Sequence, residues 1–223
     1  MKVGVLASGS GTNLQALIDA DARGALAPAR LAAVGVNVPD CAALDRARAA
    51  AIPTFVLDHR QVKPRAVFDQ ALIAELRARQ VELVVLAGFM RLLGDEFLGA
   101  FPDRVINIHP ALLPAFPGIN GQRQALDYGV KLAGCTVHFV DGGVDSGPVI
   151  AQAVVPVLDG DDESTLRGRI LVQEHRLLPA VVKAIAEGRV SLPVRDQASG
   201  GGPRVRRVRV AGTQPSGTAL SSL

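Results

Sequence analysis

The segment KVGVLASGSGTNLQALI, residues 2–18, contains a strand, a glycine loop and a helix in direct succession. Lys2–Leu6 is a short apolar run typical of a buried strand, and the sequence SGSGTN at 8–13 interrupts it. Leu14 and Leu17 then open an apolar face at helical spacing. This order is typical of the first unit of an open α/β sheet.

Farther along the chain, apolar runs typical of strands alternate with segments of helical periodicity. We expect strands at Leu31–Val38, Thr54–Leu57, Glu82–Ala87, Arg104–His109, Gly134–Val140 and Val149–Val157. We expect helices at Asp40–Ala51, Pro64–Gln80, Asp95–Phe101, Gln122–Tyr128 and Ser164–Glu187. The alternation predicts an α/β fold with a doubly wound, mostly parallel sheet, helices on both faces and an antiparallel edge made by the last two strands.

Composition excludes several classes of protein. The 223 residues are 48% apolar and 20% charged, as in an ordinary globular chain that buries a core without disulfide or metal. No apolar run approaches the ~20 residues of a membrane-spanning helix, and the first run is too short for a signal peptide. Cys41 and Cys135 lack metal-site spacing. We therefore expect a cytoplasmic protein without a metal site.

The net charge of +3 belongs to the end of the chain. Four arginines against Asp196 give residues 196–223 a charge of +3, so residues 1–195 are neutral overall. This Gly/Ser/Pro-rich tail has no periodic apolar face, and we expect it to be flexible, after one compact domain over 1–195. Because the tail has no aromatic residue to stack on a base, we do not expect it to bind nucleic acid.

The glycine loop is suited to a phosphate group. Gly11 lets the backbone approach an anion, while Thr12 and Asn13 offer donors at the start of a helix. A dinucleotide fingerprint would need glycine in place of Leu14 and an acidic residue in place of Asn37. The GK[ST] sequence of a P-loop is also absent. We expect a single phosphate here, and the alternative is a tight turn without ligand.

Two polar residues end a buried strand together. Asn107 and His109 are two positions apart, so they share one face of the strand. An amide donor beside an imidazole suits a developing oxyanion and proton transfer in acyl-type transfer. Asp145, in the Gly/Asp-rich loop 141–148, would orient and charge the imidazole if it reaches it. The alternatives are a structural histidine and a plain turn.

Four segments resemble a known family in the same order. They read VGVLASGSGTNLQAL at 3–17, VVLAGFMRLL at 84–93, INIHPALLPAFPG at 106–118 and TVHFVDGGVDSGPVIAQ at 136–152. Over residues 1–195 the chain resembles the folate-dependent phosphoribosylglycinamide formyltransferases. The resemblance implies a catalytic domain over 1–195 that transfers a formyl group from 10-formyltetrahydrofolate to the amine of glycinamide ribonucleotide in purine synthesis. It also implies these two small molecules as partners, no metal, no nucleic acid, no membrane, and a monomer or homodimer.

The resemblance also implies roles for individual residues. The catalytic residues would be Asn107, His109 and Asp145. The substrate would be held by Gly11, Thr12, Asn13 and Glu174. The folate would be held by Arg65, Met90, Arg91, Leu92, Leu93, Asn107, Val140 and Asp141. We treat His59, His138 and His175 as structural or peripheral. The alternative for His138 is that it lines the site, because it shares a strand face with Thr136.

Other functions remain as alternatives. Deformylases, methionyl-tRNA formyltransferases and sugar-nucleotide formyltransferases share the NIHP and downstream Asp elements, and the N-terminal glycine loop discriminates against them. A non-catalytic nucleotide-binding module would need the loop but not Asn107, His109 and Asp145 together. The chain departs from many family members at Gln122, where they have histidine, and from some at Leu171, where they have glutamine.

Overall fold

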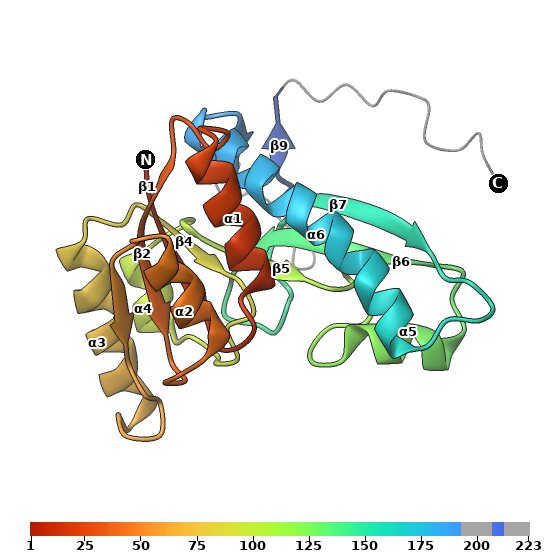
Figure 1. Cartoon of the computed structure of the whole chain (residues 1–223), viewed down its shortest axis with the longest axis horizontal. Coiled ribbons are helices and arrows are strands. Elements are labelled where there is room, and N and C mark those ends of the chain that lie inside the picture. Colours follow the sequence, from red (N-terminus) through yellow and green to blue (C-terminus); the bar gives the residue numbers. More distant parts are fainter. Residues whose placement is uncertain (193–206, 212–223) are drawn as a thin grey trace, which may run out of the picture.

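The computed structural model describes residues 1–192 and 207–211 of the chain, and its centre is one sheet. Seven strands follow the order β3-β2-β1-β4-β5-β6-β7 (Figure 1). Their bounds are β1 Lys2–Ala7, β2 Arg30–Val36, β3 Thr54–Val56, β4 Leu83–Leu86, β5 Val105–His109, β6 Leu132–Phe139 and β7 Val149–Pro156. Strands β1 to β5 pair in parallel, and β6 and β7 add antiparallel. The doubly wound sheet with an antiparallel edge is confirmed.

Helices cover both faces of this sheet, because successive residues of the strands point to opposite sides. The helices are α1 Thr12–Ala22, α2 Ala42–Ala49, α3 Arg65–Ala78, α4 Asp95–Ala100, α5 Gly121–Tyr128 and α6 Glu163–Ala186. In β1, Val3 and Val5 face the core that contains α1, α2 and α6, while Leu6 faces the core that contains α3 and α4. The predicted strands and helices are all present, with ends that differ by a few residues.

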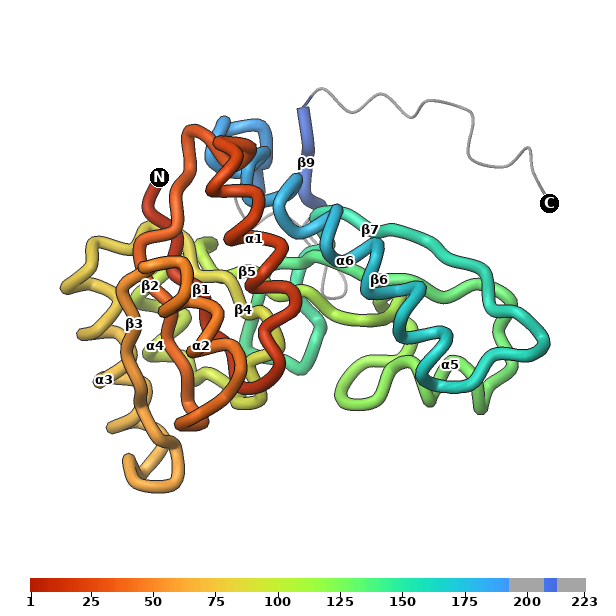
Figure 2. The backbone as a smooth tube through the Cα atoms, viewed as in Figure 1, coloured from red at the N-terminus to blue at the C-terminus, as the bar shows by residue number. Residues whose placement is uncertain are grey.

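The longest helix, α6, brings the end of the domain back to its start. Asp162 caps it by accepting a 2.8 Å hydrogen bond from the Thr165 N–H, while Thr165 Oγ1 accepts from the Asp162 N–H at 2.9 Å. The helix packs on β6, β7 and α1, and Figure 2 shows α1 and α6 side by side. Residues near 174 therefore come close to the glycine loop that precedes α1. No helix in the described ranges is long and apolar enough to cross a membrane.

Part of the tail is folded. The short strand β9, Arg209–Val210, pairs antiparallel with β8, Val190–Ser191, and Val208 and Val210 pack against the main core. The expectation of a flexible tail is therefore not met at residues 207–211, since two alternate valines give this segment an apolar side. Residues 193–206 and 212–223, including the predicted boundary at 195, lie outside the described residues.

Candidate active site

The strand β5 carries two polar side chains at the junction between the parallel and antiparallel parts of the sheet. Asn107 lies opposite His138 of β6, and His109 lies opposite Thr136. Residues that lie opposite each other in an antiparallel pair point to the same face, so these four side chains form one group. The prediction that Asn107 and His109 share a face is confirmed.

His109 is fixed from both sides of its ring. The side chain is 4% exposed, its Nε2 atom lies 2.9 Å from the Phe116 carbonyl oxygen, and its Nδ1 atom lies 3.4 Å from Asp145 Oδ2. Both partners are hydrogen-bond acceptors. With a proton on each ring nitrogen, both N–H groups have an acceptor, so the site accommodates a charged imidazole.

Asp145 lies at the centre of this cluster. Its Oδ2 atom accepts a 2.8 Å hydrogen bond from the Gly118 N–H, and its Oδ1 atom lies 3.5 Å from Asn107 Nδ2 and 3.6 Å from His138 Nε2. Burial alone would raise the pKa of Asp145, but the interactions with His138 and Gly118 and the charge of His109 outweigh it. The pKa therefore lies below its ordinary value, and Asp145 is a carboxylate at neutral pH.

His138 belongs to the cluster, although its sequence context made it peripheral. Its Nδ1 atom donates to the Phe139 carbonyl oxygen at 2.9 Å, and its Nε2 atom lies 3.2 Å from Asn107 Nδ2. The neutral ring accepts a hydrogen bond from Asn107, and the doubly protonated ring pairs with Asp145 instead. The alternation of β6 puts His138 and Thr136 on one face, but only the strand register shows which residue of β5 they meet.

The glycine loop requires its second glycine. Gly11 has a φ of 68°, and a Cβ atom there would lie 2.7 Å from the Ala43 Cα of α2. The first intrahelical bond runs from the Gln15 N–H to the Gly11 carbonyl oxygen at 2.9 Å. The N–H groups of Thr12 and Asn13 precede it and have no acceptor within the helix. The loop therefore presents donors at the positive end of α1.

Glu174 joins this loop from the last long helix. Its Oε2 atom accepts a 2.8 Å hydrogen bond from Asn13 Nδ2, and the side chain is buried. Burial raises the pKa of Glu174 above its ordinary value, and the hydrogen bond from Asn13 opposes that shift. The predicted substrate residues Gly11, Thr12, Asn13 and Glu174 therefore lie together, although they come from opposite ends of the chain.

The segment that follows β4 lies beside the glycine loop. The Met90 N–H donates to Ser8 Oγ at 2.7 Å, and this hydroxyl donates to Asn37 Oδ1 at 2.6 Å. The side chains of Met90 and Leu92 are exposed, whereas Leu93 is buried in the core with α3 and α4. Met90 and Leu92 thus present apolar surface at the edge where the strands β1 and β4 end.

Four further predicted folate residues lie outside the part already described: one begins α3, one lies within the segment after β4, and two follow β6 on the way to Asp145. Arg65 Nε lies 3.7 Å from Asp69 Oδ2, which accepts a 2.8 Å hydrogen bond from the Gly94 N–H. The guanidinium group of Arg91 lies 4.3 Å from the centre of the Phe68 ring. Asp141 Oδ1 accepts from the Gly143 N–H and from Ser146 Oγ, while Val140 packs on the core with α3 and α4. Asp141 thus shapes the turn before Asp145.

Other reactive groups are not built into the site. Burial raises the pKa of Cys135 to about 12, with a further contribution from the nearby Glu174, so this thiol is a poor nucleophile. Within residues 1–192 and 207–211, no three His, Cys, Asp or Glu side chains form a group that would hold a metal ion. The polar chemistry of the cluster therefore rests on Asn107, His109, His138 and Asp145.

Known proteins with similar sequences are named for formyl transfer or for purine biosynthesis. The family described as "Formyl transferase" matches residues 1–182. Phosphoribosylglycinamide formyltransferase of Mycobacterium tuberculosis is 50% identical over 196 residues, which is 88% of this chain and 90% of the relative. The human trifunctional purine biosynthetic protein adenosine-3 is 44% identical over 191 residues, 86% of this chain and 19% of the human protein.

A solved structure agrees with these sequence matches. Glycinamide ribonucleotide transformylase 1 from Symbiobacterium toebii superimposes with a TM-score of 0.86 at 50% identity, over 94% of this chain and 93% of that one. Family, relatives and solved structure therefore agree with one another over nearly the whole described chain. The chain belongs to the formyl transferase family and, within it, to the phosphoribosylglycinamide formyltransferases.

Proposed function

We propose that this protein transfers the formyl group of 10-formyltetrahydrofolate to the amine of glycinamide ribonucleotide, a step of purine synthesis. The observation that carries the proposal is the cluster in which Asp145 lies against His109, Asn107 and His138. The names of the relatives support the substrates, because they describe phosphoribosylglycinamide formyltransferases. We further propose that it acts in the cytoplasm as a monomer or homodimer.

The arrangement of the strands supports one common site for both substrates. The strands β1, β4 and β5 are neighbours in the sheet, so the glycine loop, the 88–94 segment and the end of β5 meet at one edge. Thr12 and Asn13 would hold the phosphate group of the substrate. Glu174, which accepts a hydrogen bond from Asn13, would contact the same substrate. The folate would contact the 90–93 segment, Arg65 and the turn at 140–141.

The reaction needs stabilisation of a negative oxygen. The neutral amine attacks the formyl carbon, a new C–N bond forms, and the formyl oxygen becomes negative. Asn107 Nδ2 donates to it, and the Nε2–H of protonated His109 turns from the Phe116 carbonyl oxygen to it when substrate binds, while Asp145 stabilises the charge on His109. Loss of the amine proton through water to Asp145, protonation of the folate nitrogen and cleavage of its bond to carbon complete the transfer. These donors belong to the protein, so the proposal requires no metal.

A single assay tests the proposal against its alternatives. Purified protein is incubated with 10-formyltetrahydrofolate, with and without glycinamide ribonucleotide, and tetrahydrofolate and formate are measured. We expect tetrahydrofolate and the formylated ribonucleotide only when both substrates are present. Release of formate without the ribonucleotide would instead identify a deformylase. Absence of turnover despite ligand binding would identify a non-catalytic binding module.

A further inference from the structure

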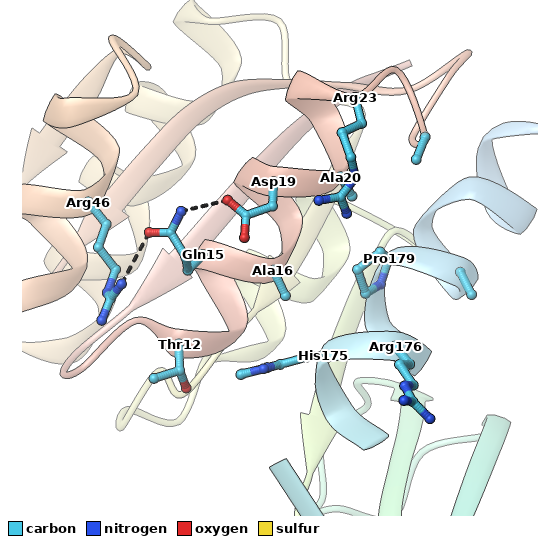
Figure 3. Close-up of a pocket in the computed structure, with 12 residues that line it drawn as sticks. Thr12, Gln15, Ala16, Asp19, Ala20, Arg23, Arg46, His175, Arg176 and Pro179 are labelled. Atoms are coloured by element: carbon cyan, nitrogen blue, oxygen red, sulfur yellow. Dashed lines mark hydrogen bonds between the residues drawn. The ribbon is translucent and has the colours of Figure 1, made fainter. Parts of the chain in front are cut away.

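A pocket of about 600 Å³ lies between α1 and α6, next to the glycine loop (Figure 3). Its polar lining includes Thr12, Gln15 and Asp19 from α1, His175 and Arg176 from α6, and Arg46 from α2. Small side chains such as Ala16 and Ala180 leave the space between the two helices open. The pocket therefore continues from the place where the substrate phosphate is expected.

The charged residues of the pocket favour an anion. Arg23, Arg46 and Arg176 line it, whereas Asp19 is its one carboxylate. The loop at 8–13 contains no charged residue of its own. The positive end of a helix corresponds to only about half an elementary charge, which leaves most of the charge of a phosphate dianion uncompensated. A cation from another element is needed beside the loop.

Arg46 is placed to supply this charge. Its Nε atom donates to the Ser10 carbonyl oxygen at 2.9 Å, and its Nη1 atom donates to Gln15 Oε1 at 3.1 Å. These bonds fix the guanidinium group against the glycine loop on one side and the first turns of α1 on the other. Among the described residues, none accepts a hydrogen bond from Nη2 of Arg46. This end of a fixed guanidinium group remains free for a ligand.

A second unpartnered group faces the same space. His175 Nε2 is buried without a hydrogen-bond partner within the described residues. Burial lowers the pKa of His175, the charge of Arg46 lowers it further, and Asp19 opposes the shift. Arg46 and His175 line the same pocket. Figure 3 shows His175 pointing from α6 towards α1 and Thr12. A phosphate group bound in this pocket would offer acceptor oxygens to this imidazole and to the guanidinium group.

Leu171 and Glu174 of α6 offer no positive charge beside Thr12, so Arg46 and His175 are the candidates for binding the phosphate group. Leu171 has no polar group for the substrate. The next residues of α6 that reach the loop or the pocket are Glu174 and His175. Glu174 already accepts from Asn13 and is acidic, so it adds no positive charge. Among the described residues that line the pocket, Arg46 is hydrogen-bonded to the loop at the Ser10 carbonyl oxygen, and His175 points towards Thr12 (Figure 3).

We propose that Arg46, assisted by His175, binds the phosphate group of the substrate from the α1–α6 pocket and sets the affinity of the enzyme for that substrate. The proposal rests on the proposed function, because it assumes a phosphate at Thr12 and Asn13. Nη2 of Arg46 donates to a phosphate oxygen, and its other two bonds keep the guanidinium group in register with the loop.

Kinetics of three variants test the proposal on the full chain. Arg46→Met removes the charge, Arg46→Lys keeps it, and Arg48→Met removes an exposed arginine of the same helix. We expect Arg46→Met to raise the KM for glycinamide ribonucleotide about 10- to 100-fold, the usual effect of losing a charge-assisted hydrogen bond. The kcat and the KM for the folate should change less than about twofold. Arg46→Lys should recover part of the loss, and Arg48→Met should match the wild type.

Binding of inorganic phosphate separates this inference from the proposed function. The ring signals of His175, assigned with His175→Gln, are followed by NMR during titration with phosphate at constant ionic strength. We expect saturable shifts in the wild type and in Arg48→Met, and at least tenfold weaker binding in Arg46→Met, whether or not the protein transfers formyl groups. Equal phosphate affinity in Arg46→Met would overturn the inference. A lower kcat of Arg46→Met with an unchanged KM for glycinamide ribonucleotide would also overturn it, because that result indicates a purely structural role. If Arg46→Met does not fold, Arg46→Gln replaces it in the titration, and an unchanged phosphate affinity of Arg46→Gln would overturn the inference.

Discussion

The Nδ1 atom of His109 lies 3.4 Å from the Oδ2 atom of Asp145, and this contact joins the end of β5 to the loop between β6 and β7. The same carboxylate oxygen accepts from the Gly118 N–H, so a third segment of the chain is tied to the pair. Three separate segments therefore fix the relative positions of an imidazole and a carboxylate. Such preorganisation is what stabilisation of a developing charge requires.

Replacing the carboxylate should remove most of the activity. In Asp145→Asn the charge that stabilises protonated His109 is lost, and we expect kcat to fall about 10²- to 10³-fold with little change in either KM. Steady-state and single-turnover kinetics measure the effect, and circular dichroism reports the fold. Asp159→Asn is the matched control, because Asp159 is exposed and, within residues 1–192 and 207–211, pairs only with Lys131 at the surface. An active Asp145→Asn enzyme would contradict the assignment.

The lowered pKa of Asp145 gives a pH dependence of stability. Its ionised form is favoured in the folded protein, so its contribution is present above the unfolded pKa of about 3.9 and is lost as the pH falls through the lower folded value. We therefore expect the difference in Tm between wild type and Asp145→Asn to be constant from about pH 8 to pH 5 and to shrink below about pH 4. Thermal unfolding across this range measures it. A difference that grows in acid would contradict the direction of the shift.

Glu174 should give the opposite pH dependence of stability. Because its pKa is raised, the folded state holds the proton more tightly, and stability decreases as the pH rises through the folded value. Glu174→Gln keeps an acceptor for Asn13 and removes the buried charge. We expect a gain on the order of 1 kcal/mol at pH 7, about 2–4 °C in Tm, that disappears below about pH 4. The KM for the ribonucleotide should rise. Glu163→Gln, at an exposed position of α6, should do neither.

The two glycines of the glycine loop should respond differently to an added methyl group. Gly11→Ala would put a Cβ atom 2.7 Å from Ala43 Cα at a φ of 68°, and we expect a loss of about 2–4 kcal/mol. A Cβ atom at Gly9 meets nothing within 4 Å, so Gly9→Ala should change stability by less than about 0.5 kcal/mol. Denaturant unfolding measures both values. Equal stability of the two variants would mean that α2 does not pack on the loop as described.

The folded part of the tail should add stability without affecting catalysis. Removal of residues 193–223 exposes the core surface that Val208 and Val210 cover, and we expect a loss of about 1–2 kcal/mol. The kinetic constants should stay unchanged, because β9 lies next to the C-terminal end of α6 (Figure 1). Removal of residues 212–223 alone is the control and should change neither quantity. A large loss of kcat on removing 193–223 would show that the tail takes part in the site.

Most of the sheet was predictable because strand and helix periodicities are local properties of the sequence. The run SGSGTN at 8–13 follows the first strand, and Asn107 and His109 lie at the end of the strand Val105–His109, so the positions of the loops followed. The side chains of Asn107 and His109 needed only the alternation of one strand. The family resemblance, not the helical pattern of its segment, implied that Glu174 contacts the substrate, and its hydrogen bond with Asn13 is known only from the structure.

The remaining contacts depend on register and on loop paths, which a single sequence does not contain. His138 faces Asn107 because β6 pairs antiparallel to β5 in one particular register. Arg46 lies in a segment rich in alanine and arginine, whose pattern resembles any exposed helix; only the packing of Ala43 on Gly11 brings it to the loop. β9 contains two residues, which is below the length at which alternation is informative.

The hydrogen bond between Asn13 and Glu174 joins residues that are made at very different times during protein synthesis. The parallel strands from β1 to β4 can pair while the nascent chain is still growing, because their partners have all left the ribosome by then. The pocket between α1 and α6 is lined on one side by α6, so it does not form until α6 emerges. On the proposed phosphate site, a newly translated chain therefore acquires its capacity to capture a phosphorylated metabolite only after α6 has left the ribosome.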